Sequence, residues 1–253
     1  MKEAPSKLPK NKWLRLVLLV FLALLWVLVV TIAVEFVIGY LLYFILGRET
    51  FNTVVWSAIY SALSYGLALL IIVLVPRKLF PKWKVNRESL GLKDLPTWTD
   101  IGLAPVGYIL ALILAGAATW LFTNFSWFNA EEVQDVGFGL LLNGVDRVIA
   151  FITLVVVAPI AEEIIFRGWL YGRLREDTAS VMNNVWSIIL SSLLVSALFG
   201  LVHLQWNVAV DVFCLSVVLC ALREVTGTIY AGILTHILKN GIAFYLLYVV
   251  GMV

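Results

Sequence analysis

The chain has 253 residues, of which 62% are hydrophobic and 13% charged, with a formal net charge of +2 and a mean hydropathy of +0.99. Soluble domains carry roughly 25% charged residues, so this chain could not cover a water-exposed surface with polar groups. The composition therefore excludes a soluble protein and predicts one that is surrounded by membrane lipids. The small net charge offers no electrostatic footprint for nucleic acid, and we expect no such partner.

Apolar stretches of about 20 residues can cross a bilayer as helices, and the chain holds about seven of them, with eight as the alternative. In chain order they are Trp13–Leu46, Thr53–Val75, Ile101–Phe122, Val145–Tyr171, Val185–His203, Val208–Leu222 and Thr228–Val253. Pro76 ends the second stretch, and Pro159 is expected to kink the fourth. No internal repeat is evident, so we predict an all-α transmembrane bundle forming a single domain over residues 1–253.

The first stretch is a span rather than a cleavable signal peptide. It is far longer than the apolar core of a signal peptide, which is about 7–15 residues, and no small-residue cleavage site interrupts it. Two cysteines, Cys214 and Cys220, lie six positions apart in one apolar stretch. Because they would point away from each other on a helix, we expect neither a disulfide nor a metal pair, but two small buried side chains.

Basic residues predict the orientation of the bundle. They are Lys2, Lys7, Lys10, Lys12 and Arg15 before the first span, Arg77, Lys78, Lys82, Lys84, Arg87 and Lys93 after the second, Arg173 and Arg175 after the fourth, and Arg223 after the sixth. The third connection instead carries Glu131, Glu132 and Asp135, which we expect to be solvated. Seven spans put every basic segment on one side, which predicts a cytoplasmic N-terminus and an external C-terminus. The membrane would be the plasma membrane if the source is a prokaryote.

Ionisable residues inside spans are functional candidates, because each costs about 2.5–3.5 kcal/mol on insertion scales. They are Glu35, Glu162, Glu163, Arg167, His203, Asp211, His236 and Lys239, with Asn240 as a neutral companion. The only two histidines of the chain are both in this set.

Glu162 and Glu163 form the strongest of these signals. Glu163 and Arg167 are four residues apart, the spacing at which side chains meet on a helix, so Arg167 is expected to hold Glu163 ionised. Glu162 points about 100° away and remains available as a base. The alternative is a salt-bridged helix end near the interface, with both glutamates in contact with water.

The two histidines differ in their surroundings. His203 ends the fifth span one turn after Phe199, which could brace the imidazole, although a histidine at a span end is also a common interfacial residue. His236 and Asn240 share one face well inside the last span. Such a pair suits an oxyanion site, which needs two donors aimed at one point, but it would also suit interhelical hydrogen bonding.

Helix geometry gives each candidate a depth. At about 1.5 Å per residue from the cytoplasmic loops, Glu162 lies roughly 15 Å deep, His236 roughly 12 Å and Asn240 roughly 18 Å. His203 lies roughly 22–27 Å deep by the same count, unless the fifth helix is tilted, broken or starts later. We therefore expect three candidates in one layer and His203 below them.

The remaining ionisable residues belong to no motif. Glu35 is expected to make a polar contact inside the first helix or to lie near the far interface. Asp211 lies close to the outer end of the sixth span, where water can reach it. Lys239 is expected either to extend toward the interface or to pair with an acid.

Three motifs in order on the late helices resemble the CAAX-protease and bacteriocin-processing family, which includes the Ras-converting CAAX endopeptidase and the bacterial Abi proteins. They are Glu-Glu-x-x-x-Arg at 162–167, Phe-x-x-x-His at 199–203 and His-x-x-x-Asn at 236–240. The flanking Arg167-Gly168 and Thr226-Gly227-Thr228 are similar to the family as well. Each motif alone is weak, but three in order that use both histidines are specific.

The resemblance covers residues 145–250, which would form the peptidase core, whereas residues 1–123 resemble the family only as variable transmembrane helices. It implies an intramembrane endopeptidase that cleaves a membrane-delivered peptide, such as a prenylated C-terminus, a leader peptide or a bacteriocin precursor. A cavity open to the cytoplasm would supply water, with the polar stretch 173–184 at its mouth. The resemblance also implies that Glu163 and Arg167 hold the glutamate helix in place and that Phe199 packs beside the site.

The family's catalytic roles carry over to four positions of this sequence. Glu162 would be the general base and His203 its partner in activating water. His236 and Asn240 would stabilise the tetrahedral oxyanion. The family has been described both as metalloproteases and as metal-free glutamate peptidases.

The metal question stays open at the level of sequence. Glu162, His203 and His236 could bind one zinc ion and leave a coordination position open. We favour a metal-free site, because glutamate is a less common third ligand and no acid is identifiable in sequence that would support both histidines. We expect no soluble cofactor. The motifs of other intramembrane proteases, such as His-Glu-x-x-His, are absent from the sequence.

Two other functions compete with the peptidase. A non-catalytic binding or immunity protein of the same fold would keep the cavity without the chemistry. A proton-coupled transporter would use Glu162 and Glu163 as proton carriers, but transporters usually show an internal repeat, and none is evident here.

Overall fold

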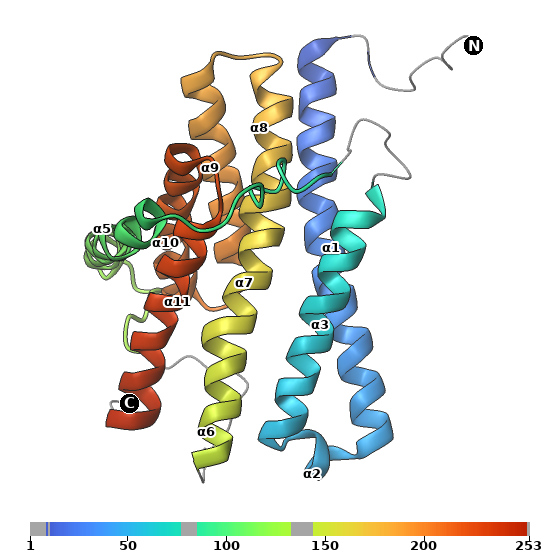
Figure 1. The fold of residues 1–253 in the computed structure, drawn as a ribbon, viewed down its shortest axis with the longest axis vertical. Helices are drawn as coiled ribbons and strands as arrows, with labels where there is room; N and C mark the ends of the chain where they lie inside the picture. Colours follow the sequence, from blue (N-terminus) through green and yellow to red (C-terminus); the bar gives the residue numbers. More distant parts are fainter. Residues whose placement is uncertain (1–8, 10, 77–84, 133–143, 252–253) are drawn as a thin grey trace.

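The computed structural model describes residue 9 and residues 11–76, 85–132 and 144–251, and their regular structure is entirely helical (Figure 1). The α-helices are α1 (Lys12–Leu46), α2 (Arg48–Phe51), α3 (Val54–Leu74), α5 (Trp98–Phe122), α6 (Gly144–Phe151), α7 (Ala158–Glu163), α8 (Gly172–Ala179), α9 (Asn184–Leu201), α10 (Trp206–Thr226) and α11 (Tyr230–Tyr245). Three π-helical segments are η1 (Ile152–Val157), η2 (Ile164–Tyr171) and η3 (Leu246–Val250). The predicted all-α bundle is confirmed.

Six helices of the described residues are long and apolar enough to cross a membrane. They are α1, α3, α5, the continuous helix from Gly144 to Ala179, α9, and the last helix from Tyr230 to Val250. α10 occupies the expected sixth span as a helix of 21 residues but is not among the six. It carries Asp211, Arg223 and Glu224, and neighbouring helices bury much of its surface.

α1 and α3 form a long hairpin joined by α2 (Figure 1). Asn11 starts α1, because its side-chain oxygen accepts hydrogen bonds from the backbone N–H groups of Trp13 and Leu14 at 2.9 and 3.3 Å. The buried residues of α1 recur every three or four positions: Leu16, Leu19, Ala23, Val27, Val30 and Val34. This narrow stripe faces the protein, and the rest of α1 exposes apolar side chains, as expected of a helix in lipid.

The fourth span changes helix type around the glutamates. The π-helical segments η1 and η2 flank the short α-helix α7, which ends at Glu163. Pro159 was expected to kink the helix, and it lies in the first turn of α7, directly after η1. In π-helical register the carbonyl of Leu154 would accept a bond from residue 159, but proline has no N–H to donate. The proline is thus accompanied by a local change of helical register.

α5 crosses the direction of the other long helices, and Figure 1 shows it nearly end-on. It packs against α10 and α11. The buried residues of α5 are all small and spaced three or four apart: Asp100, Ala104, Gly107, Ala111 and Ala115. Small residues let helix backbones approach closely, which explains how a helix with no buried bulky side chain packs firmly.

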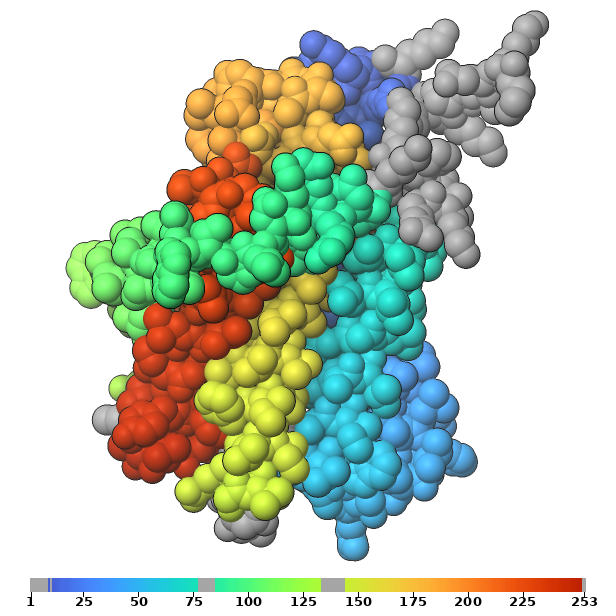
Figure 2. Space-filling model, in the orientation of Figure 1, coloured from blue at the N-terminus to red at the C-terminus, as the bar shows by residue number. Residues whose placement is uncertain are grey.

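Segment 85–97 lies on the surface between α3 and α11 and passes over the fourth span (Figure 2). The carbonyl of Gly91 accepts a hydrogen bond of 3.1 Å from the N–H of Ile229 at the start of α11. A guanidinium nitrogen of Arg223 donates to the carbonyl of Ser89 at 3.3 Å. The connection is therefore fastened to α10 and to the start of α11.

The first residues of α1 and the α8–α9 hairpin lie at one end of the molecule, and η3 ends toward the other (Figure 1). Lys12, Arg15, Arg173 and Arg175 therefore share one end. This agrees with the positive-inside prediction, although the side that faces the cytoplasm stays a prediction. The other basic residues of the N-terminal segment, those at 77–84 and Asp135 lie outside the described residues.

Candidate active site

Glu162 of α7 lies at the meeting point of three helices. Its Oε1 accepts a hydrogen bond of 2.6 Å from the hydroxyl of Tyr65 in α3. Its Oε2 faces Nε2 of His236 in α11, 3.7 Å away. That distance is too long for a direct hydrogen bond, but it is short enough for a water molecule to contact both groups. The Glu162 side chain is 14% exposed, so the carboxylate is shielded but accessible.

Glu163 is completely buried and bonded to two partners. Its Oε1 accepts hydrogen bonds from Nη1 of Arg167 at 2.8 Å and from Nδ1 of His236 at 3.1 Å. The predicted Glu163–Arg167 pair is confirmed, but the acid also orients His236, which the sequence did not suggest. His236 therefore has the supporting carboxylate that the sequence analysis could not identify.

The second oxygen of Glu163 lies against Gly232. Oε2 is buried and has no hydrogen-bond partner among the described residues. A β-carbon placed on Gly232 would lie 3.1 Å from this oxygen, closer than an ordinary contact. A glycine at position 232 thus makes room for the buried carboxylate where α11 passes α7.

Phe199 forms an aromatic wall of the site, as predicted. Its fully buried ring lies 5.1 Å from the ring of His203 and 5.9 Å from that of His236, measured between centroids. On another side the guanidinium carbon of Arg167 lies 4.5 Å from its centroid, a cation–π contact that holds the buried arginine.

His203 lies in the turn between α9 and α10. Its Nδ1 is 2.7 Å from the carbonyl of Phe199, and because a carbonyl can only accept, Nδ1 carries the hydrogen and Nε2 is left free. Glu162, His236 and Lys239 all lie close enough to His203 for their charges to act on it. The two histidines and the first glutamate therefore belong to one polar cluster.

The depth mismatch that we expected for His203 arose because the end of the fourth span was predicted too early. The fourth span does not stop at Tyr171 but continues through α8 to Ala179, so the loop from which depth is counted lies further out. From that loop, residues 162–179 and 184–203 rise by about 25 and about 29 Å at about 1.5 Å per residue. The polar stretch expected at the cavity mouth is thus mostly helix.

The side-chain amide of Asn240 donates a hydrogen bond to a backbone carbonyl. Its Nδ2 bonds the carbonyl of Leu154 at 3.0 Å, which is the carbonyl left without a donor by Pro159. One hydrogen of the amide is therefore used to satisfy the π-helical segment η1, and one remains.

Two of the motif-free acids also have neighbours here. Lys239 pairs with Asp211 at 3.1 Å, so the lysine meets an acid, one of the two outcomes expected for it. Glu35 of α1 is exposed, and its charge acts on Tyr65 and is influenced by Glu162.

Glu131 and Glu132 are exposed, as predicted. Cys214 and Cys220 are free and buried, also as predicted.

The candidate metal ligands among the described residues do not lie together as one ready-made cluster. Within them, no group of three or more His, Cys, Asp or Glu side chains is placed to hold one ion. Nδ1 of His236 and Nδ1 of His203 are hydrogen-bonded to Glu163 and to the carbonyl of Phe199. Metal-ligating histidines also bind a carboxylate or carbonyl through one ring nitrogen, so these contacts do not decide between a metal-free and a zinc site, and the metal-free site stays a prediction. No step below uses a metal.

A cavity of about 240 Å³ lies further along the helix that carries the two glutamates, where Gly168, Gly172 and Glu176 line it. Segment 85–97 covers it with Ser89 and Leu90, and Gly168, Arg173 and Glu176 line the opposite side. A β-carbon on Gly168 would lie 3.1 Å from the carbonyl of Leu90, so this glycine of the motif permits the close approach of the segment. None of the catalytic candidates lines this cavity.

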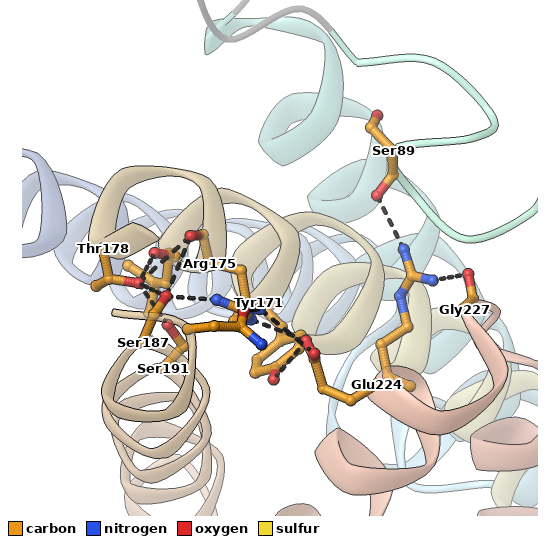
Figure 3. Close-up of polar contacts among 11 residues, drawn as sticks. Ser89, Tyr171, Arg175, Thr178, Ser187, Ser191, Glu224 and Gly227 are labelled. Atoms are coloured by element: carbon orange, nitrogen blue, oxygen red, sulfur yellow. Dashed lines mark hydrogen bonds and ion pairs between the residues drawn. The ribbon is translucent and has the colours of Figure 1, made fainter. Parts of the chain in front are cut away.

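A polar network at the same end fastens the α8–α9 hairpin to α10 (Figure 3). Glu224 accepts hydrogen bonds from Tyr171 at 2.9 Å and from Nε of Arg175 at 2.8 Å, and Arg175 also donates to Ser187. Burial raises the pKa of the Glu224 carboxyl, but the hydrogen bonds from Arg175 and Tyr171 outweigh it, so that pKa lies below its ordinary value. This network was not predicted, because its members belong to no motif and lie at or just beyond the ends of the predicted spans.

Tyr65 is the site residue that sequence reasoning missed. It lies on an apolar helix far from the motifs, where a tyrosine is hard to distinguish from an interfacial anchor. The only signal was a hydroxyl at membrane depth, which needs a hydrogen-bond partner.

Comparison with known proteins agrees with the motifs. Residues 144–242 match the family described as type II CAAX prenyl endopeptidase Rce1-like, and this range contains every motif residue from Glu162 to Asn240. No curated protein and no solved structure matches the chain.

Proposed function

We propose that the chain, whose residues 144–242 match the Rce1-like family of type II CAAX prenyl endopeptidases, is an intramembrane endopeptidase of this family. In this proposal Glu162 is the general base. The observation that carries the proposal is the pair of acceptors at the site. Oε2 of Glu162 and Nε2 of His236 face each other at 3.7 Å. Both are anchored on their other atoms, Oε1 by Tyr65 and Nδ1 by Glu163.

The proposed reaction is direct attack by water on a peptide carbonyl. A water between Glu162 and His236 gives its proton to the carboxylate as its oxygen attacks the carbonyl carbon. The resulting tetrahedral oxyanion collapses, the C–N bond breaks, and the proton passes from Glu162 to the leaving amine. Glu162 is then a carboxylate again, and a carboxylic acid and an amine have formed.

The geometry supports giving His236 the role at the attacking water that the resemblance assigns to His203. His236, rather than His203, faces the base and is supported by a buried acid. His203 keeps Nε2 free, and Asn240 keeps one amide hydrogen. We propose the remaining amide hydrogen of Asn240 as the donor to the substrate carbonyl, where hydrogen-bond donors lower the barrier. Nε2 of His203 is an acceptor in this tautomer, so His203 can donate there only when it is protonated.

We propose as substrate a peptide delivered in the membrane, such as a prenylated C-terminus, a leader peptide or a bacteriocin precursor. The exposed apolar surface of the helices suits delivery from lipid. Vesicles that contain the purified protein would be given a farnesylated peptide and the same peptide without the lipid. Cleavage of only the lipidated peptide identifies a prenyl endopeptidase, and cleavage of both identifies a broader peptidase.

The test of catalysis compares Glu162→Gln and His236→Ala with Glu176→Gln. Glu176 is a glutamate of α8 with a 68% exposed side chain, and it serves as the matched control. Glu162→Gln should abolish cleavage, His236→Ala should lower kcat by roughly 10²–10⁴-fold, and Glu176→Gln should cleave like wild type. Cleavage by Glu162→Gln at the wild-type rate would exclude this mechanism, and a cell phenotype that survives both changes would identify a non-catalytic binding or immunity protein.

A further inference from the structure

The N-terminal helices contribute one contact to the proposed base. The hydroxyl of Tyr65 donates to Oε1 of Glu162 at 2.6 Å, from α3, which lies outside the matched residues 144–242. We propose that Tyr65 is a positioning residue that orients the Glu162 carboxylate and stabilises its ionised form, an inference that rests on the function proposed above.

The side chain of Glu162 needs such a contact. The terminal torsion of a glutamate is broad and nearly two-fold, so its rotamer does not decide which oxygen faces the water. The hydroxyl of Tyr65 occupies Oε1, and this leaves Oε2 directed at Nε2 of His236. Without the hydroxyl the two oxygens become equivalent, and the acceptor pair for water loses its fixed orientation.

Tyr65 is held by the packing of α3. α3 contacts η1, α7 and η2, the three segments around the glutamates. The buried residues of α3, which face the protein, are Ser64, Ala68 and Ile72. Tyr65 follows directly after Ser64 on this face. The hydroxyl is therefore presented by a helix rather than by a loop, and no rearrangement is needed for it to reach Glu162.

A donor to the ionised carboxylate also changes the pH at which the base works. Removing a hydrogen bond to a carboxylate disfavours the ionised form, so the acidic limb of the activity profile should move to higher pH. The other charged or titratable groups that act here are Glu35 of α1, Glu163 of α7, His203 after α9 and His236 of α11. They are the same in wild type and in a Tyr65 variant, so the shift reports the hydroxyl alone.

The experiment measures kcat and KM against pH for Tyr65→Phe and Tyr60→Phe in vesicles with a cleavable peptide. Tyr60 is the matched control, because it lies on the same helix and its hydroxyl donates to the backbone carbonyl of Glu35 instead of to Glu162. Tyr65→Phe should lower kcat roughly 10-fold or more, with KM within about twofold of wild type, and should shift the acidic limb to higher pH. Tyr60→Phe should leave the position of that limb unchanged.

The outcomes separate this inference from the proposed function. If Glu162→Gln is inactive and Tyr65→Phe matches Tyr60→Phe in kcat and in its pH profile, the role of Tyr65 is wrong and the peptidase stands. If Glu162→Gln is as active as wild type, the peptidase mechanism itself is wrong. A loss of folded protein would lower the amplitude at every pH without moving the acidic limb, and that result would also overturn the positioning role.

Discussion

At the residue scale, the least replaceable feature is the completely buried group of Glu163, Arg167 and His236. Glu163 Oε1 is shared by the arginine and the imidazole at 2.8 and 3.1 Å. Two guanidinium nitrogens of Arg167 are buried without a hydrogen-bond partner among the described residues, and the cation lies over Phe199. A buried pair is weak evidence for stability in itself, but breaking one side leaves an uncompensated charge.

We expect Arg167→Met to destabilise the protein by about 3–5 kcal/mol, because Glu163 would remain buried without its cation. The double variant Arg167→Met with Glu163→Gln should recover much of this loss, because it removes both charges. Thermal unfolding in detergent of the wild type, the two single variants Arg167→Met and Glu163→Gln, and the double variant completes a double-mutant cycle. Equal stability of the single and double variants would contradict the charge explanation.

The glycine at position 232 carries a second prediction at this scale. Gly232→Ala would place a β-carbon 3.1 Å from Oε2 of Glu163 and displace that carboxylate from His236. We expect peptide cleavage to fall by roughly 10-fold or more, because small misplacements in a site have large effects on rate. Gly241→Ala is the control on the same helix, since its nearest contact would be an ordinary 3.5 Å from Val155. If both variants cleaved the peptide at the same rate, Gly232 would not be needed to make room for the carboxylate.

At the scale of elements, the fourth span shows how a helix irregularity and a motif residue depend on each other. Pro159 leaves the Leu154 carbonyl without a backbone donor, and the Asn240 amide supplies one from α11 at 3.0 Å. Inside a membrane a freed carbonyl must find a protein partner, because no lipid group can replace it. A residue expected only to bind an oxyanion therefore also has a structural role.

We expect Asn240→Leu to cost about 1–3 kcal/mol of stability, because the Leu154 carbonyl would lose its donor. In a Pro159→Ala background the same substitution should cost much less, because alanine returns a backbone N–H to this turn. Unfolding of the four proteins in detergent gives the coupling between the two positions. Additive effects would show that the proline and the asparagine act independently.

The network that joins the α8–α9 hairpin to α10 depends on pH. The folded-state pKa of Glu224 lies below its ordinary value of 4.5, so its contribution is present above that value and is lost as the pH falls through the lower folded-state pKa. Glu224→Gln should therefore destabilise the protein by about 1 kcal/mol or less at neutral pH and have little effect in strong acid. Unfolding temperatures across pH, with Glu176→Gln as the exposed control, measure this difference. A destabilisation by Glu224→Gln that grows as the pH falls would contradict this prediction.

At the scale of the whole molecule, the α1–α3 hairpin lies beside the fourth span and contributes a hydrogen bond to the candidate site. α3 supplies Tyr65, and segment 85–97 after it is fastened to Arg223, Gly168 and the start of α11. The apolar N-terminal helices are thus part of the candidate site.

The arrangement predicts that the two termini lie on opposite sides of the membrane. α1 begins at the end of the molecule that carries Arg173 and Arg175, and η3 ends toward the other (Figure 1). By the positive-inside rule the N-terminus should be cytoplasmic. A reporter that is active only outside the cell should work when fused to the C-terminus and fail at the N-terminus. The same activity at both ends would show an even number of crossings.

The lipid surroundings, the all-helical fold and the motif residues could all be predicted from the amino-acid sequence. These conclusions need only the length and apolarity of each stretch, together with the spacing of Glu163 and Arg167 on one turn. Lipid leaves the backbone few alternatives to a helix, so they hold without knowledge of the packing.

The contacts between particular atoms of the site could not be predicted without the folded structure. The rotation of a helix about its axis sets its contacts, and the π-helical segments beside Glu162 change that rotation in a way no regular 100° step predicts. In the folded structure, His236 rather than His203 faces Glu162, and Tyr65 donates to the same carboxylate. The amide of Asn240 donates to the carbonyl of Leu154. These contacts join residues far apart in the chain, and they depend on how neighbouring helices pack rather than on any local spacing.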